Sequence, residues 1–258
     1  MIERRDNLRE AIEYYCKVLS LPLIKEIYLN EAEDAAKSKI SYQQFLYNLL
    51  KQQANFRIDN SVRSKIKKAK FPFIKTIEEY DFSFQPEVDE KLIRELSELN
   101  FMEEAKNIIF VGPPGVGKTH LAVGLGIKAA KKRKRVLFFN AEELITELIK
   151  AEVSNRIAEY IESLSRIDLL IIDELGYLEV NKASSSLFFK LISRRYEKKS
   201  TIITTNKPFE EWGEIFGDEV VATAILDRLL HHSYPFLIKG KSYRMKELFK
   251  KMGRVEKE

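Results

Sequence analysis

A glycine-rich octapeptide, GPPGVGKT at residues 112–119, carries the most specific chemical signature of this sequence. It fits G-x-x-x-x-G-K-[ST], in which backbone N–H groups surround phosphate oxygens, the lysine reaches the β- and γ-phosphates and the hydroxyl ligates Mg²⁺. An apolar run precedes the octapeptide and a helical pattern follows it, as this mechanism requires. We therefore predict a nucleotide-binding loop formed by Gly112, Pro113, Pro114, Gly115, Val116, Gly117, Lys118 and Thr119.

Two adjacent carboxylates follow another apolar run, in LLIIDELGYL at 169–178. At the end of a buried strand, Asp173 would assist Mg²⁺ together with Thr119, and Glu174 would polarise the attacking water. Taken alone, such a pair is explained equally well by a strand that ends in solvated acids. Its position downstream of the glycine-rich loop favours catalysis by Lys118, Asp173 and Glu174 and hydrolysis rather than nucleotide sensing.

A third polar strand end occurs in TIITTN at 201–206. In phosphate-loop proteins with an extra strand between the loop and the acidic strand, a polar residue here lies between the γ-phosphate and the catalytic water. Asn206 could instead be a turn residue before Lys207 and Pro208. The combination with the other two motifs favours the catalytic interpretation of Asn206.

The elements that must position these motifs alternate between strands and helices. Short apolar runs occur at 107–112, 135–140, 169–174, 201–206 and 234–240, with helical patterns in the first four intervals. Continuous apolar strands joined by helical crossovers indicate a parallel sheet that is covered on both faces. The predicted fold is a three-layer α/β domain with a five-stranded parallel sheet.

The first third of the chain has a different pattern, which divides the sequence into three parts. Residues 1–69 show only helical spacing, with Leu8, Ile12, Tyr15, Cys16 and Leu19 on one apolar stripe, so we predict a small all-helical domain with a buried Cys16. Residues 70–87 contain FPFIKTIEEYDFSFQP, an aromatic linker expected to pack on the following domain. Residues 88–258 form the nucleotide-binding domain, with a reduced or absent helical lid.

Charge and hydropathy narrow the class of protein further. The chain of 258 residues is 45% hydrophobic, but it contains neither a membrane-length apolar run nor a signal peptide, which predicts a cytoplasmic protein. Its net charge of +5 permits binding to a polyanion. Basic residues also run from 239 to 254, although each cluster could be a solvated face. The candidate DNA-binding residues are Arg63, Lys65, Lys67, Lys68, Lys70, Lys131, Lys132 and Arg133.

Together these motifs resemble the AAA+ ATPases, and longer segments narrow the resemblance to one family. The order and spacing of GPPGVGKTHLAVGLG, DLLIIDELGYL, STIITTNKPFEEWGEIFGD, AILDRLLHHS and IKGKSYR look like those of IstB-type ATPases, which assist insertion-sequence transposition. The similarity covers nearly the whole chain. DnaC-type helicase loaders share the same core, but they resemble this sequence less closely in the linker and around Trp212.

The resemblance implies an ATP- and Mg²⁺-dependent ATPase that self-associates on duplex DNA, controls a partner transposase, and is reset by hydrolysis. It places the arginine finger, supplied to a neighbouring subunit, at Arg228 in TAILDRLLHHS, where the alternative is a surface salt bridge. Arg244 is a candidate contact to the nucleotide of its own subunit, although the short segment after Asn206 puts this role in doubt. Two alternatives stay open: a replicative helicase loader, and an adaptor that binds ATP without hydrolysing it.

For three remaining sets of residues, a structural role explains the sequence as well as or better than a binding role does. His120 is interpreted as a residue of the first helical turn after the glycine-rich loop. His231 and His232 are adjacent on a helix, and the sequence shows no third ligand, so we do not expect a metal site there. Tyr80 and Phe82 are candidates for the adenine pocket, but core packing would also explain them.

Overall fold

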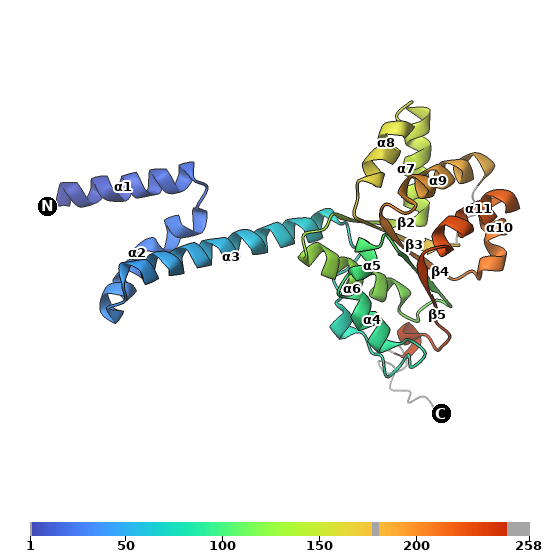
Figure 1. Cartoon of the computed structure of the whole chain (residues 1–258), viewed down its shortest axis with the longest axis horizontal. Coiled ribbons are helices and arrows are strands. Elements are labelled where there is room, and N and C mark those ends of the chain that lie inside the picture. Colours follow the sequence, from blue (N-terminus) through green and yellow to red (C-terminus); the bar gives the residue numbers. More distant parts are fainter. Residues whose placement is uncertain (1, 177–180, 247–258) are drawn as a thin grey trace. The chain divides into compact units, whose positions relative to one another are not determined.

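The computed structural model describes residues 2–176 and 181–246, with side chains from residue 7 onward (Figure 1). The chain forms two compact units, which divide between Ser64 and Lys65. This division falls within a helix, α3 (Tyr42–Lys68), whereas the sequence predicts a boundary after residue 69. The described residues include no helix with the length and hydropathy needed to cross a membrane.

The smaller unit contains helices α1 (Ile2–Val18), α2 (Pro22–Ser38) and most of α3. The side-chain amide oxygen of Gln53 accepts hydrogen bonds from the N–H groups of Leu23 and Ile24, which would otherwise be unpaired at the start of α2 (3.0 and 3.2 Å). Cys16 is buried as predicted. The core of this unit is formed by Cys16, Ile24, Tyr28 and Leu49.

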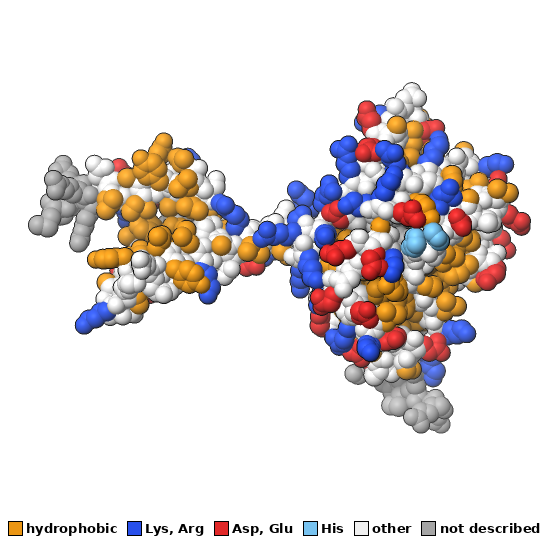
Figure 2. Space-filling view, viewed as in Figure 1, with side chains coloured by type: hydrophobic (Ala, Val, Ile, Leu, Met, Phe, Trp, Pro, Cys, Tyr) orange, Lys and Arg blue, Asp and Glu red, His pale blue; other side chains and the backbone are white. Residues whose placement is uncertain are grey.

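The apolar stripe of the first helix is only partly buried. Leu8, Tyr15 and Leu19 are each more than 60% exposed, because only one side of α1 packs on its neighbours. Hydrophobic side chains therefore cover much of the visible surface of this unit (Figure 2).

The larger unit is built on a five-stranded parallel sheet in the order β2-β3-β4-β1-β5, which confirms the predicted fold class. The β4 strand lies between β1, which precedes the glycine-rich loop, and β3, which carries the acidic pair. The strands are β1 (Asn107–Val111), β2 (Val136–Asn140), β3 (Leu169–Leu175), β4 (Ser200–Thr205) and β5 (Ser233–Leu237).

Helices cover both faces of this sheet and make three layers (Figure 1). Alternate residues along each strand enter two separate cores: Ile108 and Phe110 pack in one, and Ile109 and Val111 pack in the other. The first core is covered by α4 (Glu90–Leu96), α5 (Asn100–Glu103) and α6 (Lys118–Lys131). The second is covered by α7 (Ala141–Val153), α8 (Ile157–Ser165), α9 (Lys182–Arg195), α10 (Trp212–Phe216) and α11 (Glu219–Leu230).

The aromatic segment before α4 packs on the larger unit, as its composition predicts. It contains a single 3-10 turn, η1 (Ile77–Glu79), which begins with a capping box between Thr76 and Glu79. Ile77 and Tyr80 are buried in the first core, and Phe71 and Phe82 pack against it. The segment therefore forms part of the wall around the glycine-rich loop.

An ion-pair cluster ties the start of β3 to the start of β4. The Asp168 carboxylate accepts hydrogen bonds from the Lys199 ammonium group (2.7 Å) and from the backbone N–H of Arg135 (2.8 Å). Burial raises the pKa of Asp168, but these hydrogen bonds lower it by more, so that it lies well below its ordinary value. The charged form of Asp168 therefore stabilises the fold at this end of the sheet.

Candidate functional site

The predicted motifs converge on one cavity of about 340 Å³ in the larger unit. The cavity lies at the carboxyl ends of β1, β3 and β4, where ligands bind in parallel α/β sheets. Most of the glycine-rich loop, Glu174, Asn206 and Arg244 all contribute to its wall. The other lining residues include Phe73, Lys75, Glu79, Tyr80, Asp81, Gln85, His120, Thr204, Thr205 and Tyr243.

The glycine-rich loop connects β1 to the first turn of α6 and is covered by Tyr80. Gly117 has φ +95°, and a Cβ atom added there would lie 2.5 Å from a ring carbon of Tyr80. The Tyr80 hydroxyl donates a hydrogen bond to the Val116 carbonyl (3.0 Å). Only glycine satisfies both the backbone conformation and the close approach of this ring.

Lys118 is the buried cation of the cavity. Its ammonium group donates hydrogen bonds to the carbonyl oxygens of Gly112 (2.7 Å) and Pro113 (2.9 Å). Burial lowers the pKa of Lys118, and the positive charge of Arg244 acts in the same direction, whereas Asp173 and Glu174 oppose the shift. A phosphate group would provide the negative charge that stabilises this cation.

Asp173 is buried and is held by two hydroxyl groups. Thr119 donates to its carboxylate oxygens at 2.9 and 3.1 Å, and Thr204 donates to one of them at 2.5 Å. Burial raises the pKa of Asp173, and these hydrogen bonds oppose the increase. Because a hydroxyl and a carboxylate oxygen converge here, the donor set fits Mg²⁺, which prefers oxygen ligands.

Glu174 is exposed to the cavity, and two contacts fix its position. Its backbone is in the left-handed region (φ +60°), and its N–H donates to the Thr204 hydroxyl (2.9 Å). The Asn140 amide donates to its carboxylate (2.9 Å), while the Asn140 oxygen accepts from the Glu142 N–H at the start of α7. The neighbouring strand β4 therefore holds the Glu174 backbone, and the other neighbour, β2, orients its carboxylate.

Asn206 lies directly after β4, between the glycine-rich loop and the acidic strand. Its side-chain oxygen is buried and has no hydrogen-bond partner among the residues that the structure describes. A buried polar atom without a partner costs free energy, so a group that reaches this oxygen when the site is occupied would stabilise it. Asn206 also begins the bend that leads to Pro208, so the turn interpretation stays open.

The segment after β5 also reaches the cavity. The backbone N–H of Tyr243 donates to the Gly115 carbonyl (2.9 Å), which holds residues 242–246 against the glycine-rich loop. Arg244, predicted as a contact of its own subunit, is part of the cavity wall. Residues 247–254 of the predicted basic tail lie outside the described part of the chain.

The aromatic and histidine candidates have distinct positions. Tyr80 lines the cavity, whereas Phe82 packs against its ring with centroids 4.8 Å apart and is absent from the described cavity wall. His120 also lines the cavity, and its Nε2 lies 2.7 Å from the Thr76 carbonyl oxygen. Burial lowers the pKa of His120. Tyr80 thus retains the geometry of a base-binding candidate, and Phe82 has the packing role that the sequence left open.

Arg228 lies on α11 and does not line the cavity of its own chain as described. Its guanidinium group donates a hydrogen bond to the Ala224 carbonyl of the same helix (2.9 Å). The group also lies 4.7 Å from the ring centre of Phe189, so Arg228 is half-buried. Both contacts are weak enough to be exchanged for a negatively charged partner.

The basic candidates are divided between the two units. Arg63 belongs to the smaller unit, and Lys65, Lys67, Lys68 and Lys70 to the larger one. Lys131, Lys132 and Arg133 are all exposed, and Lys132 also pairs with Glu98 (3.3 Å). Lysine and arginine side chains occur at many places on the visible surface of the larger unit (Figure 2).

Sequence comparison decides the family. The family model described as IstB-like ATP binding protein matches residues 15–251. The chain belongs to this family. It is 52% identical over 215 residues to an ATP-binding protein named for insertion sequence IS21 of Pseudomonas aeruginosa, covering 83% of this chain and 81% of that protein. A protein named for insertion sequence IS5376 of Geobacillus stearothermophilus is 44% identical over 240 residues, covering 93% and 96%.

Solved structures agree with the AAA+ fold of this IstB-like protein. A crystal structure of the DnaC helicase loader has a TM-score of 0.50 and 29% identity, covering 58% of this chain and 87% of that one. AMPPCP-bound DnaA from Aquifex aeolicus has a TM-score of 0.56 and 19% identity, covering 73% and 59%. The latter likeness concerns the fold alone.

Among the residues of the site that the sequence did not identify, Thr204 and Asn140 contact the acidic pair directly. Both occur at or near the carboxyl ends of apolar strands, the same signal that identified Asp173 and Asn206. Thr204 was overlooked because threonine is common in strands, and Asn140 because its strand lacks a recognised motif. The sheet order shows that both strands flank the acidic strand.

Proposed function

We propose that this IstB-like protein is an Mg²⁺-dependent ATPase that assembles on duplex DNA and regulates a partner transposase. The convergence of the glycine-rich loop, Glu174, Asn206 and Arg244 on one cavity carries the proposal, with Asp173 held beside it by Thr119. The names of the relatives supply ATP binding and the insertion-sequence context. In this scheme ATP drives assembly, and hydrolysis resets it.

Each residue has a separate role in the proposed hydrolysis. Backbone N–H groups of the loop and Lys118 would bind the phosphates, and Thr119 and Asp173 would hold Mg²⁺, which neutralises phosphate charge when bound. Glu174 would accept a proton from the attacking water, with Asn206 positioning that water. Asn140 holds the Glu174 carboxylate in place until the water is present.

The cation for the transition state would come from a second copy of the chain. Arg228 lies outside the described wall of its own cavity, and its present contacts are with Ala224 and Phe189. Arginine supplied by a neighbouring subunit stabilises the charge that develops on the transferred phosphoryl group. Self-association would thereby couple assembly on DNA to ATP turnover.

ATP turnover is the first test of the proposal. Glu174→Gln retains the shape of the side chain but removes the base, so it should bind ATP normally and lose at least about 100-fold in rate. Glu159→Gln, an exposed substitution on α8, is the matched control and should keep the wild-type rate. Negligible turnover in both the wild type and Glu174→Gln would instead support an ATP-dependent adaptor.

DNA binding is tested by its dependence on salt, with and without ATP. Each contact to a phosphate contributes about −0.9 to the slope of a plot of log affinity against log salt concentration. The double variant Lys67→Glu/Lys68→Glu, at the end of α3, should bind DNA more weakly and show a less steep dependence on salt. Lys91→Glu, on α4, should change neither the affinity nor its salt dependence. Absence of duplex binding at low salt in both states would refute this part of the proposal.

A helicase loader is the second candidate, favoured by the similarity to DnaC. Such a protein would prefer single-stranded DNA and bind a replicative helicase. Comparing single-stranded with duplex DNA of equal length separates the two functions. Stimulation of ATP turnover by the purified transposase of the same insertion sequence would support the leading proposal.

A further inference from the structure

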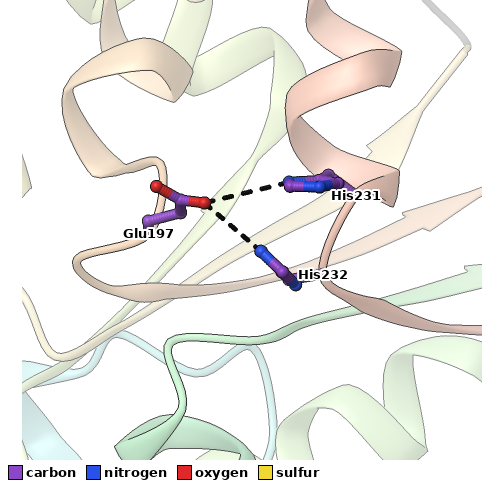
Figure 3. Close-up of side chains that lie close together, drawn as sticks. All are labelled: Glu197, His231 and His232. Atoms are coloured by element: carbon purple, nitrogen blue, oxygen red, sulfur yellow. Dashed lines mark hydrogen bonds and ion pairs between the residues drawn. The ribbon is translucent and has the colours of Figure 1, made fainter.

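A second polar cluster lies at the opposite end of the sheet from the nucleotide cavity. It consists of Glu197, His231 and His232, whose side chains converge although they come from two segments of the chain (Figure 3). One carboxylate oxygen of Glu197 lies 3.8 Å from Nδ1 of His231 and 3.3 Å from Nε2 of His232. Glu197 is thus a candidate third ligand beside the adjacent histidines, which the sequence did not show.

The spacing of these atoms is close to that of a metal-binding site. Zn²⁺ binds imidazole nitrogen and carboxylate oxygen at about 2.0–2.2 Å, so two ligands of a tetrahedral site lie about 3.4 Å apart. The three ligand atoms all lie within 4.8 Å of one another. Small side-chain rotations would bring them to this geometry, because the side chains are at the surface. Surface histidines are visible in Figure 2.

The backbone holds both segments of the cluster in place. Glu197 follows α9 and precedes β4, while the histidines connect α11 to β5. The His232 carbonyl accepts a hydrogen bond from the N–H of Asn107 at the start of β1 (2.8 Å). Because the sheet is parallel, the cluster lies at the amino ends of β4, β1 and β5, far from the cavity at their carboxyl ends. It is thus separate from the proposed Mg²⁺ site.

We propose that Glu197, His231 and His232 bind one divalent transition-metal ion, with Zn²⁺ as the ion that best fits two imidazoles and a carboxylate. Three protein ligands leave a fourth position for water or for a group from another molecule. The Tyr196 hydroxyl, 2.6 Å from His231 Nδ1, gives up this hydrogen bond when the metal binds. The ion ties the turn after α9 to the end of α11, and so restrains the helix that carries Arg228.

Metal titration of nucleotide-free, untagged protein tests the site. Zn²⁺ binding is measured by calorimetry, and Co²⁺ binding by the visible absorption that reports tetrahedral coordination. We expect one equivalent per chain, an increase in melting temperature with Zn²⁺, and a loss of affinity of at least about tenfold in each of His231→Ala, His232→Ala and Glu197→Gln. His120→Ala removes the third histidine of the chain, and Asp173→Asn alters the nucleotide cavity; both should bind Zn²⁺ as the wild type does.

Unchanged Zn²⁺ affinity in His231→Ala, His232→Ala and Glu197→Gln would overturn the proposal, as would the absence of binding by the wild type. The cluster would then be a group of surface side chains in which Glu197 contacts the two histidines without a metal ion. The titration contains no ATP or DNA, so its result does not depend on the proposed ATPase function. Restraint of α11 is relevant to catalysis only if Arg228 has its proposed role.

Discussion

Thr204 on β4 forms hydrogen bonds to both residues of the acidic pair, Asp173 and Glu174 on β3. Thr204→Val should show how much these hydrogen bonds contribute to the free energy of unfolding. Its fully buried hydroxyl donates to the Asp173 carboxylate and accepts from the Glu174 N–H. Valine has nearly the same shape, so the substitution removes both hydrogen bonds without leaving a cavity. The main effect is therefore electrostatic rather than steric.

The size of the effect follows from these two bonds. A hydrogen bond to a charged group contributes about 1.5–3 kcal/mol, and an unsatisfied buried N–H costs about 1–3 kcal/mol. The methyl group that replaces the hydroxyl stabilises the folded state by about 0.8 kcal/mol when it is buried. The contributions of neighbouring hydrogen bonds are not additive. We expect Thr204→Val to lower the free energy of unfolding by about 2–4 kcal/mol. Thr204→Ser keeps the hydroxyl and should cost about 1 kcal/mol.

Urea unfolding followed by tryptophan fluorescence measures this difference. Trp212 is the only tryptophan of the chain and is fully buried in the larger unit, so its emission reports the unfolding of that unit. ATP turnover should also fall in Thr204→Val, because Glu174 loses the acceptor that fixes its backbone. A Thr204→Val protein as stable as Thr204→Ser would refute the argument, since the hydroxyl would then contribute nothing.

Three further predictions concern other parts of the larger unit. Asp168→Asn should destabilise the fold by about 1–3 kcal/mol at pH 7 in urea unfolding. The folded pKa of Asp168 lies below its unfolded value of 3.8. The wild type should therefore exceed Asp168→Asn in free energy of unfolding by the full amount above pH 3.8, and this advantage should be lost as the pH falls through the folded pKa. An advantage that does not change with pH would contradict the prediction. Gly117→Ala should weaken binding of a fluorescent ATP analogue at least about tenfold. The added methyl group strains a left-handed backbone and meets the Tyr80 ring that covers the glycine-rich loop. Unchanged affinity would count against this packing. Arg228→Ala should retain ATP binding but lose about 10³-fold in turnover, and mixing it with Glu174→Ala should restore part of the rate; a fully active Arg228→Ala protein would return Arg228 to a surface role.

Local sequence determined the parts of this protein whose chemistry depends on neighbouring residues. The glycine-rich loop needs a fixed order of glycine, lysine and threonine, so the order of residues is enough to recognise it. Apolar runs and helical crossovers likewise predicted a parallel sheet, because burial on both faces leaves a continuous apolar pattern. The acidic pair was recognisable because it ends such a run.

Only the tertiary structure decided which distant side chains meet. The order β2-β3-β4-β1-β5 places Thr204 and Asn140 on either side of the acidic strand, and neither contact is encoded by local spacing. The same applies to Arg228 on Phe189 and to Glu197 beside the two histidines. The physical reason is that hydrogen bonds and ligand sets depend on side-chain direction and on which strands are neighbours. Hydrophobic periodicity determines which face of a helix or strand is buried, but it does not determine which helix or strand packs against that face.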